Sequence, residues 1–328
     1  MDGPRVSDFG APRDELLAAR DHTIIADLSH NALVGVSGDE ATDFLHAQFT
    51  NDVEALPEGA AQWNGWCSAK GRLLATFLLM KRADGYLILL PAEIAAAFTK
   101  RLGMFVLRSK VKIRDAGAER VRIGFAGKSA GVIVARHFGH TPDPLRSVDR
   151  EGATVVALDA DRFVVLAAPE TAPATWEALA GNATPAGAAA WEWTAIHAGI
   201  PIILPATQEA FVPQMANFEL VGGVSFKKGC YPGQEIVART QYRGILKKRM
   251  ALAHVDAPAP AAGTNVYSAA FGEQSAGEVV NAAPAPDGGA DMLVVAQVES
   301  LRSGDVRLGS PDGAKLEIRR HPAAENPA

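Results

Sequence analysis

The sequence VSFKKGCYPGQEIVART, residues 224–240, combines two adjacent lysines, one of the chain's two cysteines, a Pro-Gly turn and a Gln-Glu pair. Apolar residues precede and follow this polar centre, a pattern typical of a loop held between two packed elements. Gly229 and Gly233 flank Cys230 and Tyr231, so the backbone can turn or approach a neighbour closely on both sides. Because loops on a rigid scaffold often carry function, we predict that Cys230 lies at or near the functional site.

The composition is that of a globular protein: 328 residues, 48% apolar and 21% charged. This length is sufficient for about two or three domains. The net charge of −5 argues against general attraction to nucleic acid, although a local basic patch is compatible with it. Two cysteines, Cys67 and Cys230, are typical of a reducing cytosol. No secretory signal or membrane-spanning run is found in the sequence, so a cytoplasmic protein without a membrane partner is predicted.

The order of the expected elements favours a mixed α+β fold with a separate β region at its end. Strands are predicted within residues 23–36, and a hairpin joins residues 62–67 to residues 73–80. Helices are predicted from Gly38, from Pro91, and at residues 129–137, 175–180 and 191–199, with a loose connection at 181–190. From Met250 onward, short strands between Pro- and Gly-rich loops predict a small β-barrel.

The motif KKGCYPGQE at residues 227–235, followed by IVAR, resembles the signature of the YgfZ-type folate-binding proteins. These are relatives of the glycine-cleavage T-protein, an aminomethyltransferase. Upstream, AGIP at 198–201, FVP at 211–213 and the pair Asn217-Phe218 resemble the segment that precedes the signature. QFTND at 48–52 and AKGR at 69–72 resemble landmarks of the family's first domain. The matches cover most of the chain, which is identified as a member of this family.

The resemblance implies a three-domain ring of the T-protein kind. Two interlocked α+β domains at residues 1–245 would form the folate-binding region, and an antiparallel β-barrel would follow at residues 246–328. Tetrahydrofolate, or another folate derivative, is the implied cofactor in the central opening. The implied role is accessory: support for assembly or repair of iron–sulfur cluster enzymes, with an indirect effect on tRNA thiomodification. Iron–sulfur client or assembly proteins are the implied partners.

Two departures from the family pattern bear on activity. T-proteins carry an acidic pair after the hairpin turn, where this chain has Ala75 and Thr76. A positioned carboxylate contributes roughly 10²–10⁴-fold to proton transfer, so a typical aminomethyltransferase is not expected. Many relatives also have an acidic residue at the position of His197, and Asn31 replaces a family tryptophan.

The resemblance also assigns residues to the site. Cys230 is expected to be the functional thiol, with a thiolate favoured by the charges of Lys227 and Lys228; a buried apolar role is the alternative. Trp191 is a folate contact or part of the core, and His197 is a pterin acceptor or a surface residue. No metal site is expected, because two cysteines cannot supply the four thiolates of a cluster. The implied cofactor-binding residues are Trp191, His197, Lys228, Tyr231, Gln234, Glu235 and Arg239.

Three functions remain open on the sequence. The favoured one is the folate-binding accessory protein. The second is a folate-dependent one-carbon (aminomethyl) transferase, against which Ala75 and Thr76 argue. The third is a direct tRNA-binding module, for which a basic run could contact the RNA backbone and two tyrosines could stack on bases. The same basic run could instead hold the glutamate tail of a folate. Its members are Lys227, Lys228, Arg239, Arg243, Lys247, Lys248 and Arg249, and the tyrosines are Tyr231 and Tyr242.

Overall fold

The computed structural model describes residues 5–244 and 246–320, with the side chain of Arg243 outside the description. The chain groups into two compact units that alternate along the sequence. Unit 1 consists of Met1–Ala47, Asp52–Asn64 and Phe77–Thr194, and unit 2 consists of Gln48–Asn51, Gly65–Thr76 and Ala195–Ala328. Two short pieces of the N-terminal part therefore belong with the C-terminal part.

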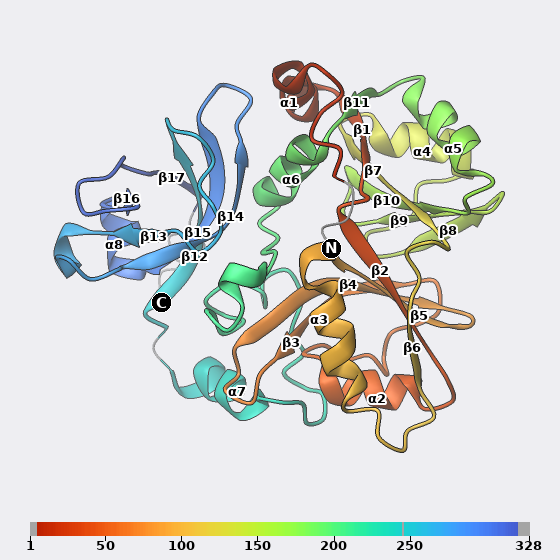
Figure 1. The fold of residues 1–328 in the computed structure, drawn as a ribbon, viewed down its shortest axis with the longest axis horizontal. Helices are drawn as coiled ribbons and strands as arrows, with labels where there is room; N and C mark the ends of the chain where they lie inside the picture. Colours follow the sequence, from red (N-terminus) through yellow and green to blue (C-terminus); the bar gives the residue numbers. More distant parts are fainter. Residues whose placement is uncertain (1–4, 245, 321–328) are drawn as a thin grey trace. The chain divides into compact units, whose positions relative to one another are not determined.

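Unit 1 contains a six-stranded sheet in the order β11-β1-β7-β10-β9-β8. Its strands are β1 (Thr23–Asp27), β7 (Val121–Gly127), β8 (Ser147–Arg150), β9 (Ala153–Ala157), β10 (Arg162–Ala167) and β11 (Thr184–Ala186). β1 and β11 are parallel, and the other neighbours are antiparallel. Helices α4 (Ala130–Phe138) and α5 (Ala172–Ala180) cover one face, where Phe125, Phe163 and Leu179 are fully buried (Figure 1).

A five-stranded sheet follows the order β3-β4-β5-β2-β6. Helix α3 (Ala92–Gly103) begins after Pro91 and buries Ile94, Phe98 and Leu102 at the predicted helical spacing. The closed end of the β3–β4 hairpin, residues 65–76, belongs to unit 2. The strands are β2 (Asn31–Ser37), β3 (Ala61–Cys67), β4 (Leu73–Arg82), β5 (Gly85–Pro91) and β6 (Lys112–Asp115), and the other helices up to residue 197 are α1 (Pro12–Asp21), α2 (Ala41–Gln48) and α6 (Ala188–His197).

The C-terminal part of unit 2 is a curled antiparallel sheet in the order β16-β13-β14-β15-β12-β17, drawn in blue in Figure 1. One face buries a core that includes Val279, Val294 and Met292. The Leu316 N–H donates to the Val306 carbonyl at 2.8 Å, so that the segment before β17 pairs with the one before β16. The strands are β12 (Lys248–Val255), β13 (Asn265–Tyr267), β14 (Gly277–Pro284), β15 (Ala290–Gln297), β16 (Arg307–Leu308) and β17 (Glu317–Arg320).

The remaining elements are short. Unit 2 contains helices α7 (Gln234–Arg243) and α8 (Val298–Ser303), together with the 3₁₀ turns η1 (Pro205–Thr207) and η2 (Ala269–Phe271). None of the helices in the described ranges has the length and apolar character that a membrane span requires.

The α+β class, the hairpin and the change to short strands near residue 250 agree with the sequence-based prediction. Residues 234–243 differ from the sequence-based prediction. We expected the polar loop to lead into an apolar segment here, whereas the structure has helix α7. Gly233 supplies a left-handed residue before this helix, and Glu235 places a negative charge in its first turn. β11 lies in the stretch predicted as a loose connection, and α1, β8 and α8 were not predicted.

Candidate functional site

The segment that contains Cys230 (the Cys230 loop, residues 224–233) is tied down where it begins. Thr50 donates its hydroxyl to the Gly223 carbonyl at 2.6 Å and accepts the Gly65 N–H at 2.8 Å. Its carbonyl accepts the Ser225 N–H at 3.0 Å. Asn51 donates its side-chain amide to the Gly222 carbonyl at 2.7 Å. The QFTND motif therefore holds the start of the loop within unit 2.

Lys228 and Tyr231 turn inward on either side of Cys230. The Lys228 ammonium is buried, donates to the Phe49 carbonyl at 2.6 Å, and lies 5.0 Å from the centre of the Tyr231 ring. Burial also raises the pKa of the Tyr231 hydroxyl above its usual value. A buried ammonium needs such hydrogen-bonding and aromatic partners to offset its lost hydration. These two side chains anchor the loop.

The loop ends against the β3–β4 hairpin through two glycines. Gly233 has φ +79°, and a Cβ added there would lie 2.4 Å from the Ser68 carbonyl oxygen and 2.5 Å from Gly71 Cα. Gly71 has φ +68°, and its added Cβ would lie 2.8 Å from Ile236 Cβ. Only glycine tolerates both the left-handed conformation and this close approach. The AKGR motif is thus the surface against which α7 begins.

Helix α7 carries the rest of the predicted residues. Gln234 donates its side-chain amide to the Lys228 carbonyl at 3.4 Å, which closes the loop on itself. Gln214 donates to the Val237 carbonyl at 2.8 Å and holds the helix from its buried side. Glu235 and Arg239 are exposed to solvent.

Cys230 itself is exposed, and its sulfur makes no hydrogen bond to the described residues. The Lys228 ammonium donates to the Phe49 carbonyl, and a stabilising effect of its charge on a Cys230 thiolate stays a prediction. Lys227 is exposed. Cys67 is 2% exposed, and burial raises the pKa of its thiol to about 12. Only one of the two cysteines is therefore accessible for chemistry.

His197 lies in a charged cluster of unit 2, away from the hydrogen bonds of the Cys230 loop. Its Nε2 is 2.7 Å from Asp291 Oδ2, and Asp291 is 1% exposed. The other Asp291 oxygen is 2.8 Å from His254 Nδ1 and accepts from Arg319 at 3.0 Å. Two histidine nitrogens and the Arg319 guanidinium thus lie within hydrogen-bond distance of this buried carboxylate, so His197 Nε2 is used within the protein.

Trp191 belongs to unit 1 and is 7% exposed. Its ring lies against Gly124 of β7, where an added Cβ would come within 2.6 Å of a ring carbon. The indole therefore packs on the face of the six-stranded sheet opposite to α4 and α5, since Gly124 alternates with Phe125. This packing corresponds to the second interpretation of Trp191, as part of the core. A contact between Trp191 and a cofactor stays a prediction.

Ala75 and Thr76, which the family resemblance predicts to stand at the position of the T-protein acidic pair, are both buried. The Thr76 hydroxyl donates to the Pro201 carbonyl at 2.8 Å and accepts the Ile203 N–H at 3.1 Å. The hydroxyl thus holds the AGIP segment to β4. There is no carboxylate at this position.

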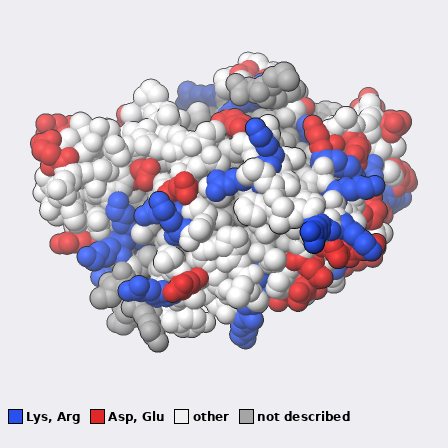
Figure 2. All heavy atoms as spheres, turned by 60° about the horizontal axis from the view of Figure 1, so that its bottom comes forward, with Lys and Arg blue, Asp and Glu red and all other residues white. Residues whose placement is uncertain are grey.

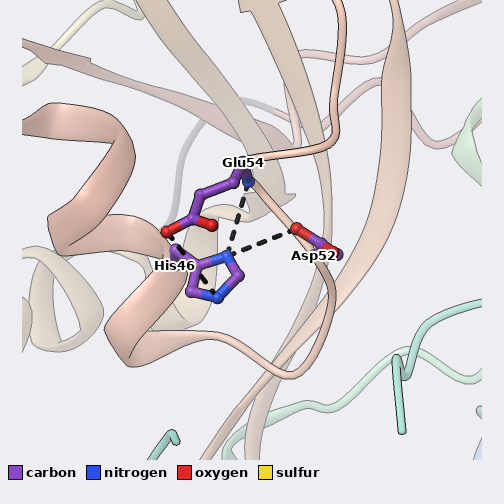
Figure 3. A group of neighbouring side chains, drawn as sticks. All are labelled: His46, Asp52 and Glu54. Atoms are coloured by element: carbon purple, nitrogen blue, oxygen red, sulfur yellow. Dashed lines mark hydrogen bonds and ion pairs between the residues drawn. The ribbon is translucent and has the colours of Figure 1, made fainter. Parts of the chain in front are cut away.

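Three further polar side chains lie together in unit 1: His46, Asp52 and Glu54 (Figure 3). Asp52 Oδ1 is 3.4 Å from His46 Nδ1, whereas Glu54 Oε1 is 4.0 Å from His46 Nε2. One possible ligand atom from each of the three residues lies within 4.8 Å of the other two, so the group has the spacing of a metal site, which was not predicted from the sequence. The Ala55 N–H donates to Asp52 at 3.0 Å, so the group closes the turn after α2.

The basic run at residues 247–249 does not form one surface. Arg249 donates to the Gln214 carbonyl at 2.9 Å and forms an ion pair with Glu219. Lys248 lines a cavity, and Lys247 is exposed. On the face drawn in Figure 2, basic and acidic side chains are interspersed. Arg249 is therefore structural, which weakens the predicted RNA-contacting run.

Several site features could not be read from local sequence. The Thr50 anchor and the Gly71–Gly233 contact each join segments that are far apart in the chain. Their only sequence signal is that QFTND and AKGR resemble landmarks of a known family. The partner of His197, Asp291, lies on β15 and gave no signal at all.

The fold and these anchored motifs define a protein of the T-protein class. Residues 5–143 match the family described as GCVT N-terminal domain. The crystal structure of glycine cleavage system aminomethyltransferase T from Bartonella henselae matches with a TM-score of 0.77, covering 94% of this chain and 88% of that chain at 18% identity. At this identity the likeness shows the fold, which confirms the predicted T-protein-like architecture.

Curated relatives specify the family within this class. The chain is 33% identical over 242 residues to "tRNA-modifying protein YgfZ" of Cronobacter sakazakii, covering 73% of each protein. It is 32% identical over 277 residues to the protein of the same name from Colwellia psychrerythraea, covering 83% of this chain and 85% of the relative. The chain belongs to the YgfZ family, as the signature around Cys230 predicts.

Proposed function

We propose that this protein is a folate-binding accessory factor that supports assembly or repair of iron–sulfur cluster enzymes, and through them affects tRNA thiomodification. The observation that carries the proposal is the exposed Cys230 thiol on a loop fixed from both sides. Lys228 and Tyr231 are buried, and Gly233 is locked against the hairpin. A thiol presented in this way is suited to react with, or bind to, something brought by a partner.

The cysteine content supports an accessory role over a resident cluster. A cluster normally takes four thiolates, and of the two cysteines only Cys230 is exposed. Cys230 would therefore act on a client's cluster or share a ligand position with a partner protein. In this role the partner supplies the remaining ligands.

Folate is the cofactor that the fold class suggests, and part of the residue set fits it. Lys227 and Arg239 are exposed, and neither forms an ion pair with the described residues. Such cations suit the glutamate carboxylates of a folate tail. Contacts from Trp191, His197, Lys228, Tyr231, Gln234 and Glu235 remain predictions. For His197, any such contact has to use a group other than the Nε2 that binds Asp291.

The transferase alternative is the less favoured one. The Thr76 hydroxyl already donates to one backbone group and accepts from another, so it is not available as a proton acceptor for a substrate. A hydroxyl also cannot replace a carboxylate as a general base near neutral pH. An accessory role needs no such base.

The thiol is tested by substitution in cells that lack the protein. Cys230→Ala should abolish rescue of iron–sulfur enzyme activity and of tRNA thiomodification, while its unfolding temperature stays within about 2 °C of wild type because the side chain is exposed. Gln241→Ala, exposed on α7, is the matched control and should rescue fully. Full rescue by Cys230→Ala would remove the thiol from the function.

The cofactor is tested by titration of tetrahydrofolate against the purified protein, with intrinsic tryptophan fluorescence as the readout. Binding should saturate at micromolar folate, and Trp191→Phe should reduce the fluorescence change if that indole contacts the ligand. Lys227→Ala and Arg239→Ala together should weaken binding of polyglutamylated folate more than that of folate with one glutamate. No saturation at physiological folate concentrations would exclude the cofactor.

A further inference from the structure

A cavity of about 170 Å³ lies on the outer face of the C-terminal sheet in unit 2. Glu278 pairs with Val295 across β14 and β15, and both line the cavity. The next residues along these strands, Val279 and Val294, belong to the core on the other face. Phe211 closes the cavity from outside the sheet. The cavity is therefore a defined space between a sheet and its covering segment.

Glu278 is a half-buried carboxylate that makes no hydrogen bond or ion pair within the described part of the chain. Burial raises the pKa of this carboxyl, and the charges of Lys248 and Arg72 act in the opposite direction. Both cations line the same cavity, but neither is within ion-pair distance of the carboxylate. The Glu278 carboxylate and the two basic side chains thus line the same cavity without forming an ion pair with one another.

The two cations keep donors for a ligand. Arg72 uses only Nη1, which donates to the Ala210 carbonyl at 2.6 Å and to the Glu209 carbonyl at 3.2 Å. Its Nε and Nη2 have no partner among the described residues, and neither has the Lys248 ammonium. The backbone contacts also fix the guanidinium plane, so its remaining donors have a set direction. A fixed arginine fork and a lysine are suited to a carboxylate.

We propose that this cavity binds a zwitterionic small molecule of amino-acid size. Arg72 and Lys248 hold its carboxylate, and Glu278 accepts from its ammonium group. An anion alone would leave Glu278 without a partner, and a cation alone would leave Arg72 and Lys248 without one; a zwitterion gives each of the three a partner of opposite charge. The volume is below the roughly 300 Å³ of sites for larger ligands, which limits the ligand to a few non-hydrogen atoms.

This site is separate from the proposed function of Cys230. None of the residues that line the cavity belongs to the Cys230 loop or to α7. Rescue by a Cys230 variant and ligand binding by the cavity can therefore be measured independently.

Titration with L-alanine, followed by protein-observed ¹⁵N NMR on the full chain, tests the proposal. Saturable shifts should appear in residues 210–215 and in β14, with a Kd on the order of 1 mM, as expected for so small a ligand. Acetate, methylammonium and inorganic phosphate should each bind at least about tenfold more weakly, because the two anions leave Glu278 unpaired and methylammonium leaves Arg72 and Lys248 unpaired. Phosphate or acetate binding as tightly as L-alanine would overturn the zwitterion assignment, and the absence of saturable shifts would overturn the site.

Two variants assign the contacts. Glu278→Gln should weaken L-alanine binding about tenfold without weakening acetate, since only the ammonium contact is lost. Lys248→Met should weaken both ligands about tenfold. Lys247→Met, a neighbouring exposed lysine, is the matched control and should change neither. Equal effects of Lys247→Met and Lys248→Met would show a general charge effect and overturn the proposal.

Discussion

Cys67 and Cys230 both belong to unit 2, yet their surroundings are opposite. Cys67 ends β3 with 2% of its surface exposed, and its thiol has a pKa of about 12 because of burial. Cys230 is exposed, whereas its neighbours Lys228 and Tyr231 have buried side chains. The difference shows how a loop can present a thiol: its neighbours are fixed in the interior, and the cysteine is left at the surface.

The largest expected contrast between the two cysteines is in alkylation rate. A rise in pKa from 9.0 to about 12 lowers the thiolate population of Cys67 about 1,000-fold at pH 8, and burial slows access further. Brief exposure of the native protein to iodoacetamide should therefore label Cys230 alone, as measured by peptide mass spectrometry. In denaturant both should be labelled. Comparable native labelling of Cys67 would break the contrast.

The second test removes the fixed end of the Cys230 loop. Gly233→Ala should lower the free energy of unfolding by about 3 kcal/mol, because the new methyl group meets the hairpin backbone in a left-handed conformation. Gly222→Ala is the matched control, with φ +73° and no atom within 4 Å of its added Cβ. It should cost only about 1 kcal/mol for its backbone conformation. Denaturant titration measures both, and equal losses would contradict the close contact.

The third test separates the two lysines. Lys228→Met should destabilise the protein by about 2 kcal/mol, because the buried Phe49 carbonyl loses the hydrogen bond from the lysine. Lys227→Met should change stability by no more than about 0.5 kcal/mol, since the side chain is exposed. Thermal and denaturant unfolding supply the values. If the two variants are equally stable, Lys228 does not anchor the loop.

The smallest expected effect is a pH dependence carried by Cys67. Its folded pKa of about 12 lies above the unfolded value of 9.0, so its contribution to stability is complete below pH 9 and is lost as pH rises toward 12. Between pH 8 and pH 10 the wild type should lose about 1.4 kcal/mol more than Cys67→Ala. Unfolding of both proteins at the two pH values gives this difference. If the free energy of unfolding changes with pH equally in wild type and Cys67→Ala, the pKa of Cys67 is not raised by folding.

Local pattern predicted the elements whose cause is local. The buried positions of α3 and the β3–β4 hairpin followed from helical spacing and from the turn between two apolar runs. The turn at Gly233 was also expected from its sequence. Helix α7 was missed because Pro232 and Gly233 suggested a continuing loop, whereas the left-handed glycine starts the helix.

The site depends on contacts that local pattern cannot predict. Lys228 was noted for its charge beside Cys230, and its hydrogen bond to the Phe49 carbonyl was not predicted. His197 has its partner, Asp291, on a distant strand. Both hydrogen bonds join segments that are far apart in the sequence, which a local pattern does not reveal. The family resemblance predicted where the candidate site lies, and the structure shows which contacts hold the Cys230 loop.

Thr76 makes the loss of the acidic pair difficult to reverse in evolution. Its hydroxyl both donates and accepts, joining the Pro201 carbonyl to the Ile203 N–H. An aspartate at this position could accept from Ile203, but when ionised it would face the Pro201 carbonyl with a second acceptor. A return to acid–base chemistry would thus require a second change in the 201–203 backbone. The Thr76 hydroxyl therefore ties the choice of residue at this position to the backbone of residues 201–203.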